Sequence, residues 1–152
     1  MEAKKELKVS AIKNGTVIDH IPSQNLFSVI TILGLNKIQQ QVTFGFNLES
    51  KKLGKKAIIK VADIFFKDED LNKISLVAPD AKLNIIRDYE VIEKKVVSVP
   101  DTISGIAKCM NPKCITNHEQ MTTSFEVVNK VPVALKCLYC EKITDQEHLE
   151  IL

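Results

Sequence analysis

The sequence of 152 residues lacks several features that would assign it to a common functional class. It has no apolar run of about 18 residues, so no membrane-spanning helix is expected. Residues 1–8 lack the apolar core of a signal peptide, which predicts an intracellular, cytoplasmic protein without a membrane partner. No glycine-rich phosphate loop, nucleophile elbow or HExxH motif occurs, and therefore we predict no catalytic residue.

Cysteine is also scarce, and all of it lies in the last third of the chain. Two close pairs separated by 22 residues are typical of a four-cysteine zinc site, here Cys109, Cys114, Cys137 and Cys140. Four thiolates close a tetrahedral structural site, so one structural Zn²⁺ per chain is predicted. Two disulfides are the alternative, but a reducing compartment favours zinc. His118 and His148 could offer nitrogen ligands nearby, but four thiolates already complete the site, so we expect both histidines to be surface residues.

The small net charge of +2 is unevenly distributed. Residues 1–100 carry 16 Lys or Arg against 12 Asp or Glu, a net charge of +4. Residues 101–152 carry 5 against 7, a net charge of −2, and a zinc tetrathiolate adds further negative charge. A zinc-ribbon protein that binds nucleic acid is an alternative function, but this acidic end has the wrong sign for gripping phosphates. A stand-alone enzyme lacks a nucleophile and an open metal site.

Hydrophobic periodicity predicts a mixed fold. Ser23 is the expected N-cap of one helix, and Asp68 lies in the acidic start of another. The order of elements lacks βαβ regularity, which favours an α+β domain with a largely antiparallel sheet. Asn14-Gly15 reads as a hairpin turn. A boundary at Val99-Pro100-Asp101 divides the chain into domains 1–100 and 101–152. Alternation predicts strands at 7–12, 16–21, 41–48, 56–61, 82–86, 89–97, 123–128 and 132–136.

Lysines in the first domain form a second candidate site. Lys56 and Lys60 lie four residues apart on a predicted strand, so their side chains share one face, and Lys94 is a third cation. These residues suit a phosphate, although a solvated edge strand protected by lysine is the alternative. Asp19 and His20 are neighbours on a strand and should point to opposite faces, which argues against an acid–base pair.

Longer motifs occur in order along the chain: GTVIDHIP at 15–22, GKKAIIK at 54–60, Ala78-Pro79 with Asn84, YEV at 89–91, CMNPKCI at 109–115 and CLYCE at 137–141. Together they closely resemble the regulatory chain of aspartate carbamoyltransferase. The resemblance covers nearly the whole sequence and both predicted domains.

The resemblance implies a non-catalytic regulatory subunit in pyrimidine biosynthesis. Residues 1–100 would form an allosteric domain, a ferredoxin-like antiparallel sheet with two helices, that binds CTP or ATP, with UTP as a further candidate. Residues 101–152 would form a small all-β zinc domain that docks onto the catalytic chain. The regulatory chains would pair with each other through their allosteric domains.

The resemblance also assigns residues to the nucleotide. Lys60 and Lys94 would hold phosphates, Asp19 and Lys56 would lie near the ribose and phosphates, and His20 would lie close to the phosphate end. The positions that would surround the base or line the same pocket are Val9, Ala11, Ile12, Val17, Asn84, Ile86, Tyr89 and Val91. The same resemblance assigns the four cysteines as zinc ligands. Ser10 and Glu93 depart from the family pattern.

Overall fold

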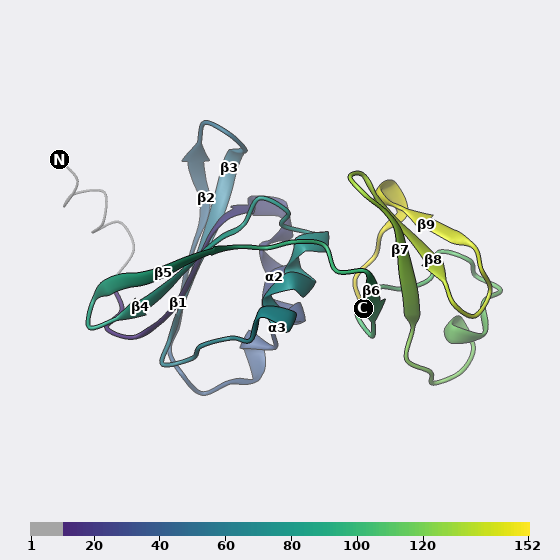
Figure 1. The fold of residues 1–152 in the computed structure, drawn as a ribbon, viewed down its shortest axis with the longest axis horizontal. Helices are drawn as coiled ribbons and strands as arrows, with labels where there is room; N and C mark the ends of the chain where they lie inside the picture. The colour runs from purple at the N-terminus through teal and green to yellow at the C-terminus, as the bar shows by residue number, and fades with distance from the viewer. Residues whose placement is uncertain (1–10) are drawn as a thin grey trace. The chain divides into compact units, whose positions relative to one another are not determined.

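The computed structural model describes residues 11–152, which divide between Ser98 and Val99 into two compact units (Figure 1). Predictions on residues 1–10, including Val9, Ser10 and most of the strand at 7–12, lie outside the described residues. Ala11 and Ile12, at the end of that predicted strand, belong to no strand. No helix within residues 11–152 is long and apolar enough to cross a membrane.

The first unit is built on a five-stranded antiparallel sheet with the order β2-β3-β1-β4-β5. Its strands are β1 (Gly15–Pro22), β2 (Val42–Ser50), β3 (Gly54–Ala62), β4 (Lys82–Arg87) and β5 (Glu90–Val96). Its helices are α2 (Leu26–Ile32) and α3 (Asp68–Lys73), with single 3₁₀ turns at Ser23–Asn25, Leu35–Lys37 and Ile74–Leu76. The succession β1-α2-β2-β3-α3-β4 is the predicted ferredoxin-like arrangement, extended at one edge by β5.

One face of this sheet forms the core of the unit. Ile18 on β1 pairs with Ile59 on β3 and Leu83 on β4, and all three side chains are buried. Figure 1 shows α2 and α3 on the same side of the sheet, where Leu26 and Leu71 are buried. Because side chains alternate between faces along a strand, the intervening residues point to the face that bears no helix.

Gly15 begins β1, and the predicted hairpin turn at Asn14-Gly15 is wrong. Gly15 has φ +141°, and a Cβ there would lie 2.0 Å from the carbonyl oxygen of Val61. Glycine is therefore required for the close approach of β1 to β3. Gly34, by contrast, follows α2 with φ +66°, the left-handed conformation expected just past a helix.

The start of the first helix differs from prediction. Ser23 does not cap α2, because its hydroxyl oxygen accepts a hydrogen bond of 3.1 Å from the backbone N–H of Asn47. Phe27 on α2 is 61% exposed, and its ring centroid lies 6.3 Å from those of Phe44 and Phe46 on β2. At Ser23, a contact with the edge strand β2 thus replaces the predicted cap, although the helix itself forms.

The second unit is a four-stranded antiparallel sheet in the order β6-β7-β8-β9. Its strands are β6 (Thr102–Ser104), β7 (Ser124–Lys130), β8 (Val133–Cys137) and β9 (Ile143–Asp145), with 3₁₀ turns at Ile115–Asn117 and Gln146–His148. Phe125, Leu135 and Ile103 are buried between them. The predicted small all-β unit is confirmed, although β6 and β9 were not predicted.

Candidate functional site

Each cysteine pair lies in a tight turn of the second unit. Cys109 and Cys114 lie in the segment before the 3₁₀ turn Ile115–Asn117, where the N–H of Cys114 donates to the carbonyl of Asn111 at 3.0 Å. Cys137 ends β8, and the N–H of Tyr139 donates to its sulfur at 3.4 Å. The two turns bring the sulfurs of all four cysteines within 4.8 Å of one another.

The sulfur cluster has the geometry of a tetrahedral zinc site. A Zn²⁺ ion with Zn–S distances of about 2.3 Å separates its sulfur ligands by about 3.8 Å. The Sγ atoms of Cys109 and Cys140 lie 3.6 Å apart, and those of Cys114 and Cys137 lie 3.7 Å apart. A disulfide would need about 2.05 Å. The donor set and spacing therefore fit a structural zinc ion whose four positions are all supplied by protein.

The pKa values of the thiols determine how metal binding depends on pH. Burial raises the pKa of Cys109 to about 12 and also raises the pKa of Cys137. At Cys140 burial acts in the same direction, but hydrogen bonds from the Asn111 side chain and the Lys142 backbone outweigh it and lower the pKa to about 7. Binding of a metal ion therefore displaces protons, and its affinity falls in acid.

Hydrogen bonds from outside the cysteine pairs hold the first turn in place. The Asn117 side chain donates to the carbonyls of Cys109 and Asn111, at 3.0 and 2.8 Å. The hydroxyl of Thr144, a buried residue of β9, accepts from the N–H of Met110 at 3.1 Å. The sequence gives no local sign of the Thr144 contact, because Thr144 lies 34 residues from Met110.

The two histidines are not part of the cluster, as predicted. His118 is exposed at the end of the 3₁₀ turn Ile115–Asn117. His148 is also exposed, and its Nδ1 lies 2.6 Å from a carboxylate oxygen of Asp145. Hydrogen bonding to Asp145 raises the pKa of His148, and the same contact lowers the pKa of Asp145.

The helix-free face of the first sheet gathers most of the predicted nucleotide residues. Strand register places Lys60, Val17, Asn84 and Lys94 in one row across β3, β1, β4 and β5. Directly paired residues on antiparallel strands point to the same face. Four residues that are far apart in sequence are thereby aligned.

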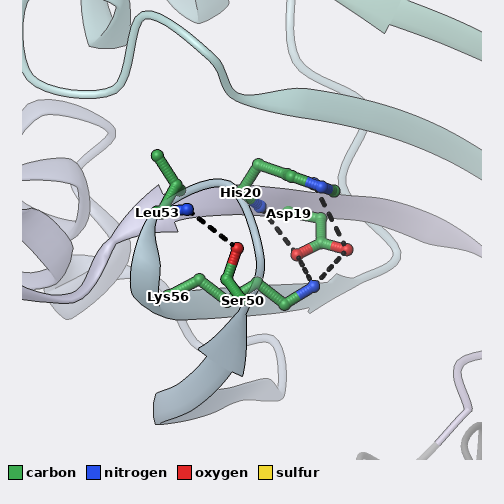
Figure 2. A network of polar contacts seen from close by, with 5 residues as sticks. All are labelled: Asp19, His20, Ser50, Leu53 and Lys56. Carbon is green, nitrogen blue, oxygen red and sulfur yellow. Dashed lines mark hydrogen bonds and ion pairs between the residues drawn. The ribbon is translucent and has the colours of Figure 1, made fainter.

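Asp19, His20 and Lys56 form a polar cluster next to this row (Figure 2). The Lys56 ammonium lies 2.9 and 3.2 Å from the two oxygens of Asp19. The backbone N–H of His20 donates to Asp19 at 2.6 Å, and the His20 ring nitrogen Nδ1 lies 3.6 Å from the same carboxylate. His20 Nδ1 is buried and has no hydrogen-bond partner among residues 11–152.

This cluster corrects the prediction that Asp19 and His20 point to opposite faces. The pairing of β1 with β3 shifts between Ile18 and Ile21, and His20 adopts φ +61°. A β-bulge of this kind re-aims side chains, so regular alternation fails here.

The remaining predicted residues lie toward the other end of β1 and are mostly apolar. Ile86 is buried and pairs with Gly15, and Val91 pairs with Ile86 across β4 and β5. Tyr89 is 67% exposed, and its N–H donates to the carbonyl of Lys13 at 2.9 Å. Ala11 is exposed and Ile12 is half-buried; Val9 lies outside the described residues.

Each unit has a cavity within its described residues. One of about 380 Å³ lies beside Asp68 and Lys95, and another of about 420 Å³ lies beside Cys109 and His148. Neither is lined by a predicted nucleotide residue. Lys82 pairs directly with Asp19, a proximity that only the strand register reveals.

Comparison with known proteins decides the family. The model of the allosteric domain of the aspartate carbamoyltransferase regulatory chain matches residues 7–98, and the model of its metal-binding domain matches residues 101–150. The chain belongs to the aspartate carbamoyltransferase regulatory chain family. It is 59% identical to the regulatory chain of Bacteroides fragilis and 60% identical to that of Bacteroides thetaiotaomicron, over 99% of each chain. It is 53% identical to that of Pyrococcus abyssi, over 95% of this chain and 96% of the relative.

Membership in this regulatory chain family confirms several predictions. The protein is a non-catalytic regulatory chain with an allosteric and a metal-binding domain, and pyrimidine biosynthesis follows from that name. The four clustered cysteines and the metal-binding domain fit the predicted structural zinc site.

Proposed function

We propose that this regulatory chain binds a nucleoside triphosphate, CTP or ATP, along the helix-free face of its first sheet. The observation that carries the proposal is the row of Lys60, Val17, Asn84 and Lys94, which unites four predicted contacts on one face. A regulatory chain with an allosteric domain requires an effector site, and this face has the chemistry of one.

Along β1 the face changes from apolar near Gly15 to polar near Asp19, which matches the order of base and phosphates in a nucleotide. Beside Gly15, the buried Ile86 and the half-buried Ile12 offer apolar surface to a base. Beside Asp19, His20 and Lys56 offer polar groups to phosphates. Gly15 and Asp19 are four residues apart, about 13 Å along a strand, a span that suits an extended nucleoside triphosphate.

Calorimetry with CTP and ATP tests this site. Lys60→Ala and Lys94→Ala should each weaken binding by about tenfold or more, since a charge-assisted hydrogen bond contributes about 1.5–3 kcal/mol. Lys55→Ala is the matched control, because Lys55 lies on the same strand as Lys60 and its side chain points to the other face. Equal affinities of the wild type and both site variants would refute the assignment.

We further propose that the second unit docks onto the catalytic chain. The zinc thiolates would keep the turn at Asn111 and the segment 115–119 rigid, and that segment exposes Ile115, His118 and Glu119. Rigid presentation avoids the cost of ordering a segment during association. We place the assembly in the cytoplasm, because thiolate metal centres persist in reducing surroundings.

Gel filtration of the assembled enzyme tests the docking role. Ile115→Asp should weaken association with catalytic chains at least about tenfold while the zinc content stays at one ion per chain. Val131→Asp is the control, because Val131 is also exposed but lies in the turn between β7 and β8. Capture of the thiols by a mercurial should release active catalytic chains that no longer respond to CTP or ATP. A complex that survives both Ile115→Asp and zinc loss would contradict this role.

The third proposal is that two regulatory chains pair through their first units. Phe27, Phe44 and Phe46 form an exposed aromatic cluster on α2 and the edge strand β2. An edge strand with exposed aromatic residues is a surface that a second copy could cover. Phe27→Asp should therefore shift the isolated regulatory chain from dimer to monomer in sedimentation at micromolar concentration. A wild-type chain that sediments as a monomer would exclude this pairing.

A further inference from the structure

Lys82 lies at the cationic end of the polar sheet face. It is the first residue of β4, it pairs directly with Asp19 on β1, and it pairs with Val96 on β5. Since Asn84 pairs with Lys94, Lys82 and Lys94 are diagonal neighbours on one face. Such neighbours lie about 7–8 Å apart, within joint reach of one phosphate group for two long side chains.

None of the residues that the structure describes compensates the charge of Lys82. Asp19, its direct neighbour, is bound by Lys56 at 2.9 Å instead. No carboxylate within residues 11–152 forms an ion pair with Lys82 or Lys94, and both side chains are exposed. This end of the face therefore has three ammonium groups, from Lys56, Lys82 and Lys94, against the single carboxylate of Asp19.

The position of this excess charge indicates which part of a ligand it would meet. Lys82 lies level with Asp19, at the opposite end of β1 from Gly15 and the apolar residues beside it. A nucleotide whose base lies at the apolar end directs its phosphates toward Asp19. The group farthest from the base is the terminal phosphate, which carries the most negative charge.

We propose that Lys82 binds the terminal phosphate of the effector, together with Lys94, and makes the site selective for nucleoside triphosphates over diphosphates. The inference rests on the proposed nucleotide site and adds to it a residue and a selectivity. A lysine ammonium suits this role because it is a mobile point charge that can follow the end of a flexible phosphate chain.

The test is calorimetry of the full-length, zinc-loaded chain with CTP and CDP at low ionic strength. Lys82→Gln removes the charge and keeps most of the stem. It should weaken CTP binding by about tenfold and change CDP binding by less than about twofold. Lys55→Gln, on the other face of β3, should leave both affinities unchanged. An unchanged melting temperature of nucleotide-free Lys82→Gln serves as the folding control.

The outcomes separate this inference from the proposed site. If wild-type protein binds neither nucleotide, the proposed function fails, and the role of Lys82 fails with it. If the wild type binds CTP and Lys82→Gln binds it equally well, the site stands and the role of Lys82 is refuted. Equal losses for CTP and CDP would also refute it, because Lys82 would then not act on the terminal phosphate.

Discussion

Loss of one zinc ligand should unfold the second unit and spare the first. Cys114 is 1% exposed, and its sulfur lies 3.7 Å from that of Cys137 in the centre of a unit with few large buried side chains. A core of about 50 residues rarely supplies more than about 3–5 kcal/mol of stability, whereas structural zinc contributes about 10–16 kcal/mol of binding free energy. The zinc-binding free energy lost in Cys114→Ala should therefore exceed the stability that the core of the unit supplies.

Hydrogen exchange read out by mass spectrometry would measure this effect unit by unit. In Cys114→Ala, peptides from residues 99–152 should lose protection, and peptides from residues 15–98 should keep it. Val128→Ala is the matched control, because Val128 is an exposed apolar residue on β7 and should change the free energy of unfolding by no more than about 0.5 kcal/mol. Protection that persists throughout 99–152 in a zinc-free variant would refute the argument.

Three further predictions follow from local geometry. Gly15→Ala should destabilise the first unit by about 3 kcal/mol or more in urea denaturation, because the new Cβ meets the β3 backbone. Gly34→Ala should lower the free energy of unfolding by only about 1–2 kcal/mol, since its Cβ would lie in open space. The pKa of His148 should lie above that of an ordinary histidine in an NMR titration, because the ring hydrogen-bonds to Asp145, and it should fall toward the ordinary value in Asp145→Asn. The ion pair therefore stabilises the fold most between about pH 3.8 and pH 6.5. Its contribution falls as the pH rises through the raised pKa of His148, and also as the pH falls through the lowered pKa of Asp145. Asn117→Ala should speed zinc release to a chromogenic chelator and cost about 1–3 kcal/mol, because two backbone carbonyls lose their donor; unchanged release would contradict that role.

Local patterns in the sequence were enough to predict most strands and the metal ligands. Alternation located the strands of the first sheet because one of its faces is buried, and the cysteine spacing located the metal site because each pair occupies a single turn. The same reasoning placed Lys56 and Lys60 on one face of β3, where the pairing with β1 puts them.

Features that depend on distant partners could not be predicted in this way. The bulge at His20 arises from the register of β1 against β3, some 40 residues later, and Lys82 becomes part of the polar face only because β4 pairs with β1. Ser23 bonds to Asn47 instead of capping its helix. The strands β6 and β9 have three residues each, too few for a periodic signal.

The central position of β1 has a consequence for synthesis on the ribosome. Of the strands that the structure describes, β1 is the first to be made, yet both of its neighbours in the sheet, β3 and β4, come later, and Arg87 ends the second of them. At about 5–20 residues per second, the interval between Pro22 and Arg87 is roughly 3–13 seconds. During that time β1 lacks β4, and until Ala62 completes β3 it has neither of its sheet partners. The hairpins β2–β3 and β4–β5 join neighbouring segments, whereas β1 pairs with two distant ones. Among the described strands, β1 is therefore made first and waits longest for both of its partners.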